Sequence, residues 1–167
     1  MTETANVKKV DLVVTRILDA PLELVWKAWT EPEQVMRWWG PKYYTSPSCQ
    51  IDLRVGGKYI FAMQAPENQG GQISYTSGVY KKIVPMQLLE FTQSLSDENG
   101  NRLDPARAGM PPDFPKEVLT VVTFRAKGEM TELTIAEDGW TMSQMYVYSY
   151  AGLQQQTDKL AELIGRK

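Results

Sequence analysis

The chain has 167 residues, of which 43% are hydrophobic and 23% are charged, and its formal net charge at pH 7 is −2. This composition is typical of a single globular domain, 1–167 with a core over about 8–165, and the absence of a basic stripe argues against a nucleic-acid partner. The sequence has no histidine and one cysteine, Cys49, which excludes a serine–histidine triad and an ordinary zinc site, so we expect no metal and no cofactor.

The first half of the chain predicts one strand followed by two short helices. Residues 8–18 alternate between two faces as a β-strand does. Helices are predicted over about 21–30 and 31–39, because each begins near a proline and a Gly-Pro pair stops the second. Adjacent helical side chains point roughly 100° apart, so we expect Trp38 to seal the base of the core and Trp39 to border a pocket.

The middle of the chain predicts an antiparallel meander. Short alternating segments bounded by turn residues are typical of strands joined by hairpins. Six such segments occupy 48–54, 57–64, 73–84, 87–95, 117–126 and 130–137. One loop interrupts the rhythm: 96–115 holds four of the ten prolines, and loops of that length are usually functional or mobile.

The last segment, 139–165, changes its period from two to about 3.6 residues, which predicts a long helix with a mostly apolar stripe. The fold class is therefore α+β. A seven-stranded antiparallel sheet curls strongly, so a straight helix across its concave face leaves space toward the ends. We predict a pocket there. The alternative is that the helix packs on the sheet and that methionine only fills gaps in the core.

Strand alternation selects the side chains that face this pocket. The strand over 73–84 is ambiguous, because Tyr75 and Val79 share one face while Gly78 and Tyr80 share the other; we take the first pair as inner. The predicted ligand-binding side chains are Trp39, Tyr59, Phe61, Met63, Tyr75, Val79, Phe91, Val122, Met142, Met145, Tyr146 and Leu153.

Polar candidates are few. Asp52 and Arg54 are two residues apart on one predicted strand, so they share a face and are candidate anchors for a ligand carboxylate or hydroxyl, as is Arg16. The alternative for the pair is a surface ion pair worth at most about 1 kcal/mol. Glu137 is assigned to the outer face with the other strand glutamates, and no catalytic residue is predicted.

Three segments resemble a known family. "TRILDAPLELVWKAWTEPEQVMRWWGP", "IDLRVGGKYIFAM" and "AGLQQQTDKLAELI" are similar to signatures of the bacterial proteins related to the C-terminal domain of the activator of Hsp90 ATPase. The resemblance spans about residues 8–165. It implies the helix-grip fold of the START-like (SRPBCC) superfamily, whose members hold lipids, polyketides or other hydrophobic molecules between sheet and helix. Leu153 and Thr157 stand where the family usually has tryptophan and leucine.

Three functions are therefore open. The first is binding of a small hydrophobic molecule without turnover. The second is a cyclase- or hydrolase-like enzyme that uses the same pocket, which requires an ionisable group deep in it. The third is a module that stimulates a chaperone ATPase, which is weakened because these residues lack the extra N-terminal domain of eukaryotic activators. We expect the first.

The expected surroundings of the protein follow from what the sequence lacks. The first residues have no apolar signal core, and no apolar stretch approaches the ~20 residues of a spanning helix, so we expect a cytoplasmic protein without membrane insertion. A homodimer is compatible with the sequence.

Overall fold

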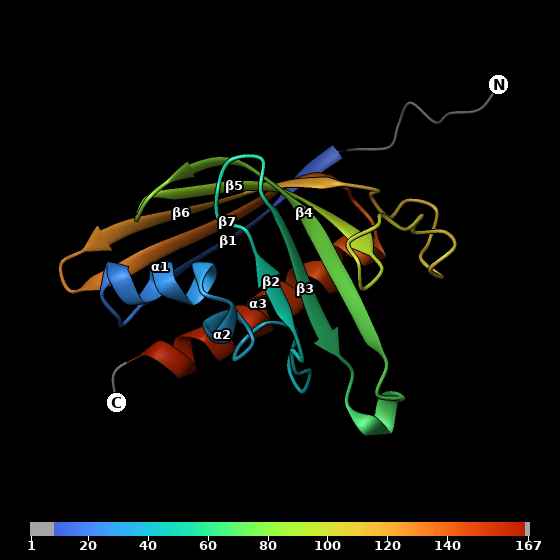
Figure 1. The fold of residues 1–167 in the computed structure, drawn as a ribbon, viewed down its shortest axis with the longest axis horizontal. Helices are drawn as coiled ribbons and strands as arrows, with labels where there is room; N and C mark the ends of the chain where they lie inside the picture. The colour runs from blue at the N-terminus through green and yellow to red at the C-terminus, as the bar shows by residue number, and fades with distance from the viewer. Residues whose placement is uncertain (1–8, 166–167) are drawn as a thin grey trace.

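A curved antiparallel sheet and one long helix across its concave face form the body of the molecule (Figure 1). The computed structural model describes residues 9–165, so Lys8 of the first predicted strand and the segment used for the signal-peptide prediction lie outside the described residues. The α+β helix-grip prediction is confirmed, with all seven strands and the two short helices in the expected order.

All seven strands pair with antiparallel neighbours in one sheet, in the order β1-β7-β6-β5-β4-β3-β2. Their bounds are Lys9–Leu18 (β1), Cys49–Ile51 (β2), Lys58–Gln64 (β3), Ile73–Val84 (β4), Leu88–Ser96 (β5), Val118–Lys127 (β6) and Met130–Thr141 (β7). The first strand thus pairs with the last, and the two short helices carry the chain from β1 to the opposite edge at β2.

The helices are α1 (Leu22–Thr30), α2 (Pro32–Val35) and α3 (Gln144–Ile164), with a 3₁₀ turn over Glu67–Gln69. Two helices differ clearly from their predicted bounds. The second short helix ends at Val35, and only turns follow it up to Trp38. The long helix starts later than expected because β7 continues to Thr141, and Ser143 Oγ caps it by accepting a hydrogen bond from the backbone N–H of Tyr146 at 3.3 Å.

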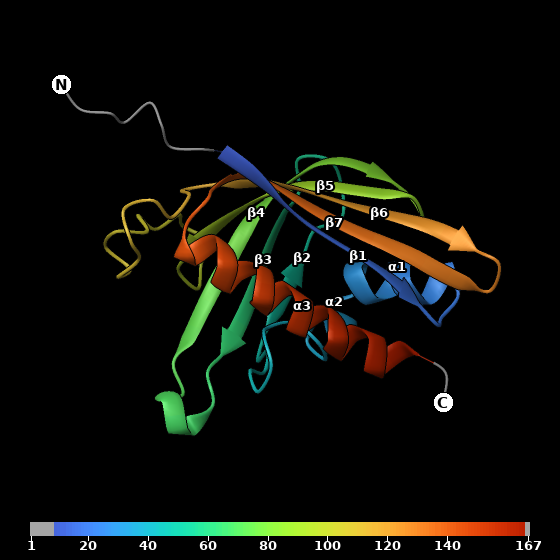
Figure 2. The ribbon, with the colours of Figure 1, turned by 180° about the vertical axis from the view of Figure 1, so that it is seen from behind.

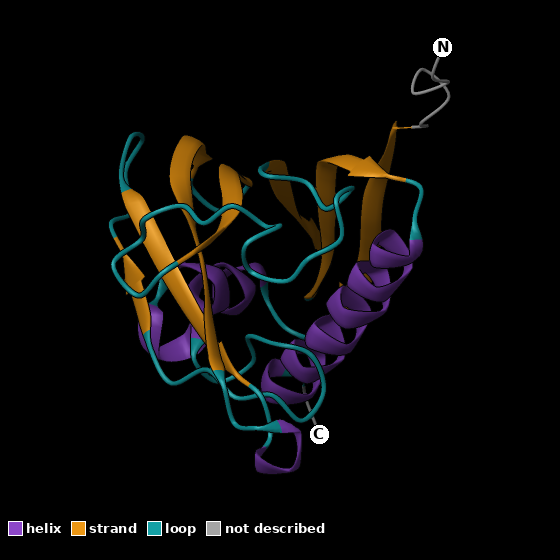
Figure 3. Ribbon diagram, turned by 90° about the vertical axis from the view of Figure 1, so that its right-hand side faces the viewer, coloured by secondary structure: helices purple, strands orange, loops and turns teal. Residues whose placement is uncertain are grey.

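Helix α3 packs on β1 and on α1, and it crosses below the arched sheet (Figures 2 and 3). The N-terminal end of α3 lies at the same end of the molecule as the loop between β5 and β6, whereas its C-terminal half lies near α1 and α2. The two ends of the concave space are therefore closed by different elements.

Tryptophans close the helical end. Trp29, Trp38 and Trp39 pack on one another in tilted and edge-to-face arrangements with ring centroids 4.8–6.5 Å apart, and Trp39 packs edge-on against Phe61 at 4.7 Å. Trp38 Nε1 donates to Ala28 O at 2.9 Å, which satisfies the indole in the core. Trp38 seals the base of the core as predicted. Trp39 is 7% exposed and belongs to the same cluster.

Lys159 of α3 fastens the segment after the tryptophans. Its ammonium donates to Gly40 O at 3.0 Å and to Tyr44 O at 2.9 Å, while Gln156 Oε1 accepts from Gly40 N at 2.8 Å. Desolvation lowers the pKa of Lys159, but these carbonyls satisfy the ammonium. The helical end is therefore held by hydrogen bonds as well as by aromatic packing.

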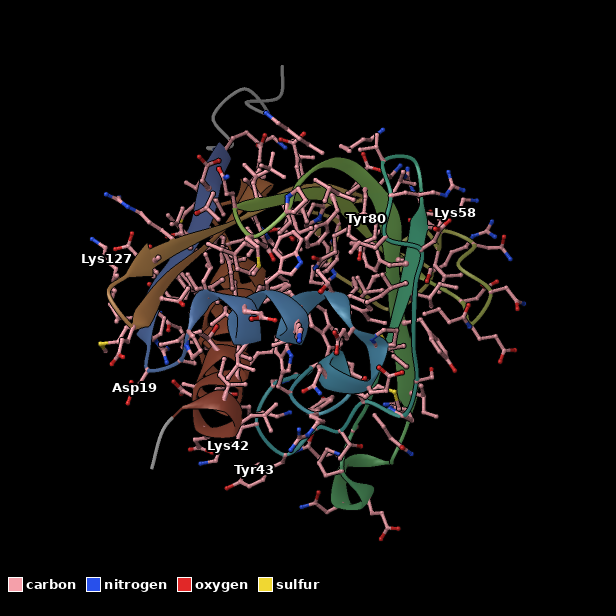
Figure 4. The ribbon with its side chains drawn as sticks, turned by 60° about the vertical axis from the view of Figure 1, so that its left-hand side comes forward. Asp19, Lys42, Tyr43, Lys58, Tyr80 and Lys127 are labelled. Carbon is pink, nitrogen blue, oxygen red and sulfur yellow. The ribbon has the colours of Figure 1, made fainter. Side chains whose placement is uncertain are left out.

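The register of β4 corrects one predicted face. Tyr59 lies opposite Gly78 and Phe61 opposite Thr76, and directly opposed side chains point to the same side of a sheet. Thr76 and Gly78 are therefore inner residues, as is Tyr80, which points into the molecule in Figure 4. The prediction for Tyr75 and Val79 is wrong: they lie on the outer face. Apolarity misled it, because the inner side of β4 carries a glycine at position 78, where an added Cβ would lie 1.7 Å from Thr92 O.

Candidate functional site

The proline-bearing loop forms a wall over the end of the sheet that the tryptophans leave open. Leu103 N donates to Leu95 O at 2.9 Å and Thr141 Oγ1 donates to Asp113 O at 3.3 Å, so the loop is attached to β5 and to the end of β7. Phe114 packs edge-on against Trp140, with ring centroids 5.5 Å apart. The loop thus reaches over the concave face and covers its interior.

Two adjoining hollows lie under and beside this loop, and we call them together the loop-side pocket. The inner one, about 40 Å³, is lined by Thr76, Gln93, Ser94, Leu95, Phe114, Pro115, Val118 and Trp140. The outer one is a groove of about 410 Å³ lined by Met63, Ile73, Ser74, Tyr75, Leu95, Ser96, Asp97, Glu98, Leu103, Ala108 and Met110. They share Leu95. The inner part has room for about one water molecule, whereas the groove has the volume of a small-ligand site.

Only two of the predicted pocket residues line this pocket, Met63 and Tyr75, and Tyr75 reaches it from the outer face. Many of the others are core residues that pack on the aromatic cluster or beneath α3. This second group comprises Trp39, Tyr59, Phe61, Phe91, Val122 and Leu153. The prediction of a pocket between the sheet and the long helix is therefore corrected: these side chains fill that space, and the loop-side pocket has no lining residue from α3.

The remaining predicted lining residues have other surroundings. Met142 is 58% exposed, because it precedes α3 instead of lying on its inner stripe. Met145 and Tyr146 are partly buried against the core, and Tyr146 OH donates to Asp11 O at 3.3 Å. Val79 lines a polar hollow on the outer face with lysine and arginine neighbours. A ligand role for Met145 and Tyr146 stays a prediction.

The three polar anchor candidates are paired elsewhere. Arg16 donates to Asp158 Oδ1 and to Gln154 Oε1, both at 2.7 Å, and so ties β1 to α3. Asp52 and Arg54 form an exposed ion pair at 2.9 Å in the turn after β2, so their placement on a strand is wrong. The short β2 ends at Ile51 because the tight turn that contains Gly57 follows at once.

Glu137 is the charged group that the sequence assignment missed. It lies on the inner face of β7, directly opposite Thr120 of β6, and is 7% exposed. Burial raises the pKa of its carboxyl above 4.5, while the hydrogen bond from Trp140 lowers it in part. Its placement on the outer face was wrong, because Glu137 has the same parity as the inner residues Leu133 and Ile135. Parity alone could have found it.

A β-bulge positions Trp140, whose indole N–H is the hydrogen-bond donor to this carboxylate. Val10 pairs with Trp140 and Leu12 with Glu137, so Asp11 alone faces the two residues Asp138 and Gly139. Residues three apart on a regular strand point to opposite faces. At the bulge, Gly139 takes φ +110°, which turns the indole back so that Trp140 Nε1 donates to Glu137 Oε1 at 2.9 Å.

Other ionisable groups in the interior, Tyr59 and Cys49 among them, are held neutral. Burial, followed by the neighbouring Tyr80 and then Glu137, raises the pKa of Tyr59 well above 10, and its hydroxyl donates to Thr92 O at 2.6 Å. Burial and the nearby Glu33 raise the pKa of Cys49 to about 12, so its thiolate is not available as a nucleophile at neutral pH. Among these buried groups, Glu137 is the one whose carboxyl can take part in proton transfer or bind a ligand at neutral pH.

Residues 9–165 include no group of three or more histidine, cysteine, aspartate or glutamate side chains that could hold a metal ion. Within the same range, no helix has the length and apolar character needed to cross a membrane.

Comparisons with known proteins agree with the fold. The family model described as "Activator of Hsp90 ATPase homolog 1-like protein" matches residues 19–165. The chain is similar to a solved protein of Nitrosomonas europaea, with 26% identity and a TM-score of 0.72 over 92% of this chain and 93% of that one. A comparison with curated proteins found no match.

Two further solved structures share the fold at lower identity. A protein of Chromobacterium violaceum has 24% identity and a TM-score of 0.73, over 94% of this chain and 98% of that one. A protein of Silicibacter pomeroyi, itself described as AHSA1, has 21% identity and a TM-score of 0.71, over 92% and 96% of the two chains.

Proposed function

Because the chain belongs to the family of activator of Hsp90 ATPase homolog 1-like proteins, we propose that it binds a small hydrophobic molecule in the loop-side pocket. The fold of this family is compatible with a ligand-binding module or with an activator-like module. The observation that carries the proposal is the apolar groove of about 410 Å³, which adjoins the inner pocket at Leu95. A ligand in the groove would bury apolar surface that is now partly in contact with water.

The residues of the groove support this choice of ligand. Most of its lining side chains are apolar, and two of them are methionines, Met63 and Met110, whose flexible thioethers adapt to ligands of varied shape. Leu103 of the loop is 39% exposed at the groove. Ile73, at 43% exposure, lines the same groove, and a contiguous exposed apolar surface at a concave site is typical of a ligand-binding surface.

Titration with Nile red, whose fluorescence rises in apolar surroundings, tests the proposal. Leu103→Asp should reduce the fluorescence increase several-fold, because it puts a charge into the groove. Leu24→Asp is the matched control, since Leu24 is a similarly exposed leucine (46%) on the first turn of α1, far from the loop. Equal loss in both variants, or none in either, would contradict binding at this pocket.

One observation favours a second function, an enzyme. Glu137 is an ionisable group within the concave face, as an enzyme that moves protons requires, and burial has raised the pKa of its carboxyl toward neutral pH. The enzyme and the binding protein differ in turnover. Native mass spectrometry of protein purified from its own host separates them: a retained, unaltered small molecule supports binding, and a mixture of two related species supports catalysis.

A further inference from the structure

The carboxylate of Glu137 has an oxygen that no described donor occupies. Within residues 9–165, Trp140 Nε1 is the one hydrogen-bond donor to this carboxylate, and no lysine or arginine lies within ion-pair distance of it. An ionised carboxylate accepts several hydrogen bonds, and a buried one is costly when they are not made. Oε2 is therefore free to accept a further hydrogen bond.

Two polar side chains, Thr120 and Gln93, continue from Glu137 across the inner face of the sheet. Thr120 is its direct partner across β6, and Thr120 Oγ1 donates to Gln93 Oε1 at 3.4 Å. Gln93 pairs with Val118, one step nearer to the loop than the row of Phe91, Thr120 and Glu137. Gln93 and Val118 line the inner pocket. The carboxylate thus lies one row of residues deeper than the inner pocket.

Trp140 joins the carboxylate to that pocket. Its indole lines the inner pocket with one part and donates to Glu137 with its N–H. The bulge at Asp138 and Gly139 produces this arrangement, and bulges are frequent where a strand must re-aim a side chain beside a functional site. A molecule that enters the pocket would contact Trp140, whose N–H is bonded to the carboxylate.

Phe114 covers this route. Its ring lies against Trp140, and Pro115 next to it completes the cover over the inner pocket. The groove reaches the same place from outside at Leu95. Movement of Phe114 away from Trp140 would widen the inner pocket, which adjoins the groove at Leu95, and bring a ligand within reach of the polar row.

We propose that Glu137 is the specificity-determining group of the loop-side pocket, and that it accepts a hydrogen bond from a hydroxyl or ammonium group at one end of an otherwise apolar ligand. The inference rests on the proposed function. Its physical basis is desolvation: a ligand with a donor satisfies Oε2, whereas a purely apolar ligand leaves the buried carboxylate under-paired. The ligand class is therefore an apolar alcohol, phenol or amine.

Three probes with one skeleton test this inference by calorimetric titration of the full chain. 2-Naphthylmethanol, 2-naphthylmethylamine and 2-ethylnaphthalene differ only in a terminal hydroxyl, ammonium or methyl group. We expect at least one donor-bearing probe to bind about tenfold more tightly than the ethyl probe, as for one charge-assisted hydrogen bond. The better of the two donors identifies the ligand as an alcohol or an amine.

Glu137→Gln should reduce this preference to less than about threefold, because a neutral amide accepts a weaker hydrogen bond. Glu132→Gln is the matched control. Glu132 lies on the outer face of the same strand, with its Oε1 3.9 Å from Arg125 Nη1 and its Oε2 4.0 Å from Lys127 Nζ. The control should keep the wild-type preference. A second readout needs no variant: the Trp140 indole N–H resonance of the wild type should shift more with the preferred donor probe than with the ethyl probe.

The outcomes separate this inference from the proposed function. If the wild type binds all three probes equally, or if Glu137→Gln keeps the preference, the role of Glu137 is overturned while hydrophobic binding stands. If no probe binds to the folded wild type, both are overturned. Loss of the preference in Glu137→Gln but not in Glu132→Gln supports both.

Discussion

A carboxylate at position 137 is an unusual choice for the inner face of a sheet. The neighbours of Glu137 along the same face, Leu133 and Ile135, are buried aliphatic residues, and a further one would bury apolar surface at no electrostatic cost. The chain instead places an acid there and bends β7 to give it one hydrogen bond. Such a residue lowers stability, so its presence is easier to explain by recognition than by folding.

That cost predicts how stability depends on pH. Burial raises the pKa of Glu137 in the folded protein above its unfolded value, so between the two pKa values the folded state keeps a proton that the unfolded state has lost. The contribution of Glu137 to the free energy of unfolding is therefore greatest below the unfolded pKa and falls as the pH rises through the folded pKa. Glu137→Gln should gain stability relative to wild type over this window.

Urea unfolding of both proteins from about pH 4 to about pH 8 measures the effect. The difference between the two curves is the informative quantity, because other groups cancel in it. Asp97, for example, has its pKa lowered by hydrogen bonds from Asn101, which gives the opposite pH dependence, but equally in both proteins. Parallel stability curves would show that Glu137 titrates normally and is not desolvated.

At the scale of single elements, two glycines have opposite roles. Gly139 takes φ +110° in the β7 bulge, and an added Cβ would also lie 3.4 Å from Glu117 O. Gly152 lies within α3, where an added Cβ would meet nothing nearer than Pro41 Cβ at 3.9 Å. The first glycine is required by backbone geometry, and the second only adds flexibility to a helix.

Alanine substitutions should therefore change stability in opposite directions. Gly139→Ala should destabilise by about 1–2 kcal/mol, the usual cost of a left-handed non-glycine residue, and should weaken the Trp140–Glu137 hydrogen bond. Gly152→Ala should stabilise by about 0.5–1 kcal/mol. Chemical denaturation measures both, and the indole N–H resonance of Trp140 reports on the hydrogen bond. A neutral Gly139→Ala with an unchanged resonance would show that the bulge does not need glycine.

These elements also show what the sequence could predict. The order of strands and helices was predictable, because turn residues bound every strand and β4 matches its predicted bounds. The face of the sheet to which each side chain points was less predictable. On β4, the pairing of Tyr59 with Gly78 depends on register, which no single strand reveals. On β7, the bulge that turns Trp140 toward Glu137 depends on pairing with β1, which is distant in sequence.

The position of the pocket was predictable only in outline. The curl of the sheet predicts free space between the sheet and the ends of the helix, whereas the loop-side pocket lies between the sheet and the loop and no residue of α3 lines it. The sequence does not say which end is filled. Trp29, Trp38 and Trp39 fill the helical end through mutual contacts, so the predicted place of Trp39 at a pocket is not where the hollow lies. The length and prolines of the 96–115 loop mark it as unusual, but they do not show that the loop lines a pocket.

The whole molecule is therefore asymmetric in its packing, and this predicts where it responds to a ligand. At the helical end, the mutually packed indoles and the contacts of Lys159 fix the backbone. At the other end, the loop is fastened by a few hydrogen bonds and by the contact of Phe114 with Trp140. Segments with few buried contacts open most readily, so the loop is the element that must move when a ligand enters.

Hydrogen exchange with and without Nile red tests this difference. We expect bound dye to slow amide exchange over residues 102–117 and near Trp140, because a ligand under Phe114 adds apolar contacts to the loop. Exchange over α1 and the turn around Gly40 should stay unchanged, since that end is already closed. Protection confined to α1 and α2 would mean that the dye displaces the tryptophans instead, and that the ligand enters through the end of the molecule that packs most tightly.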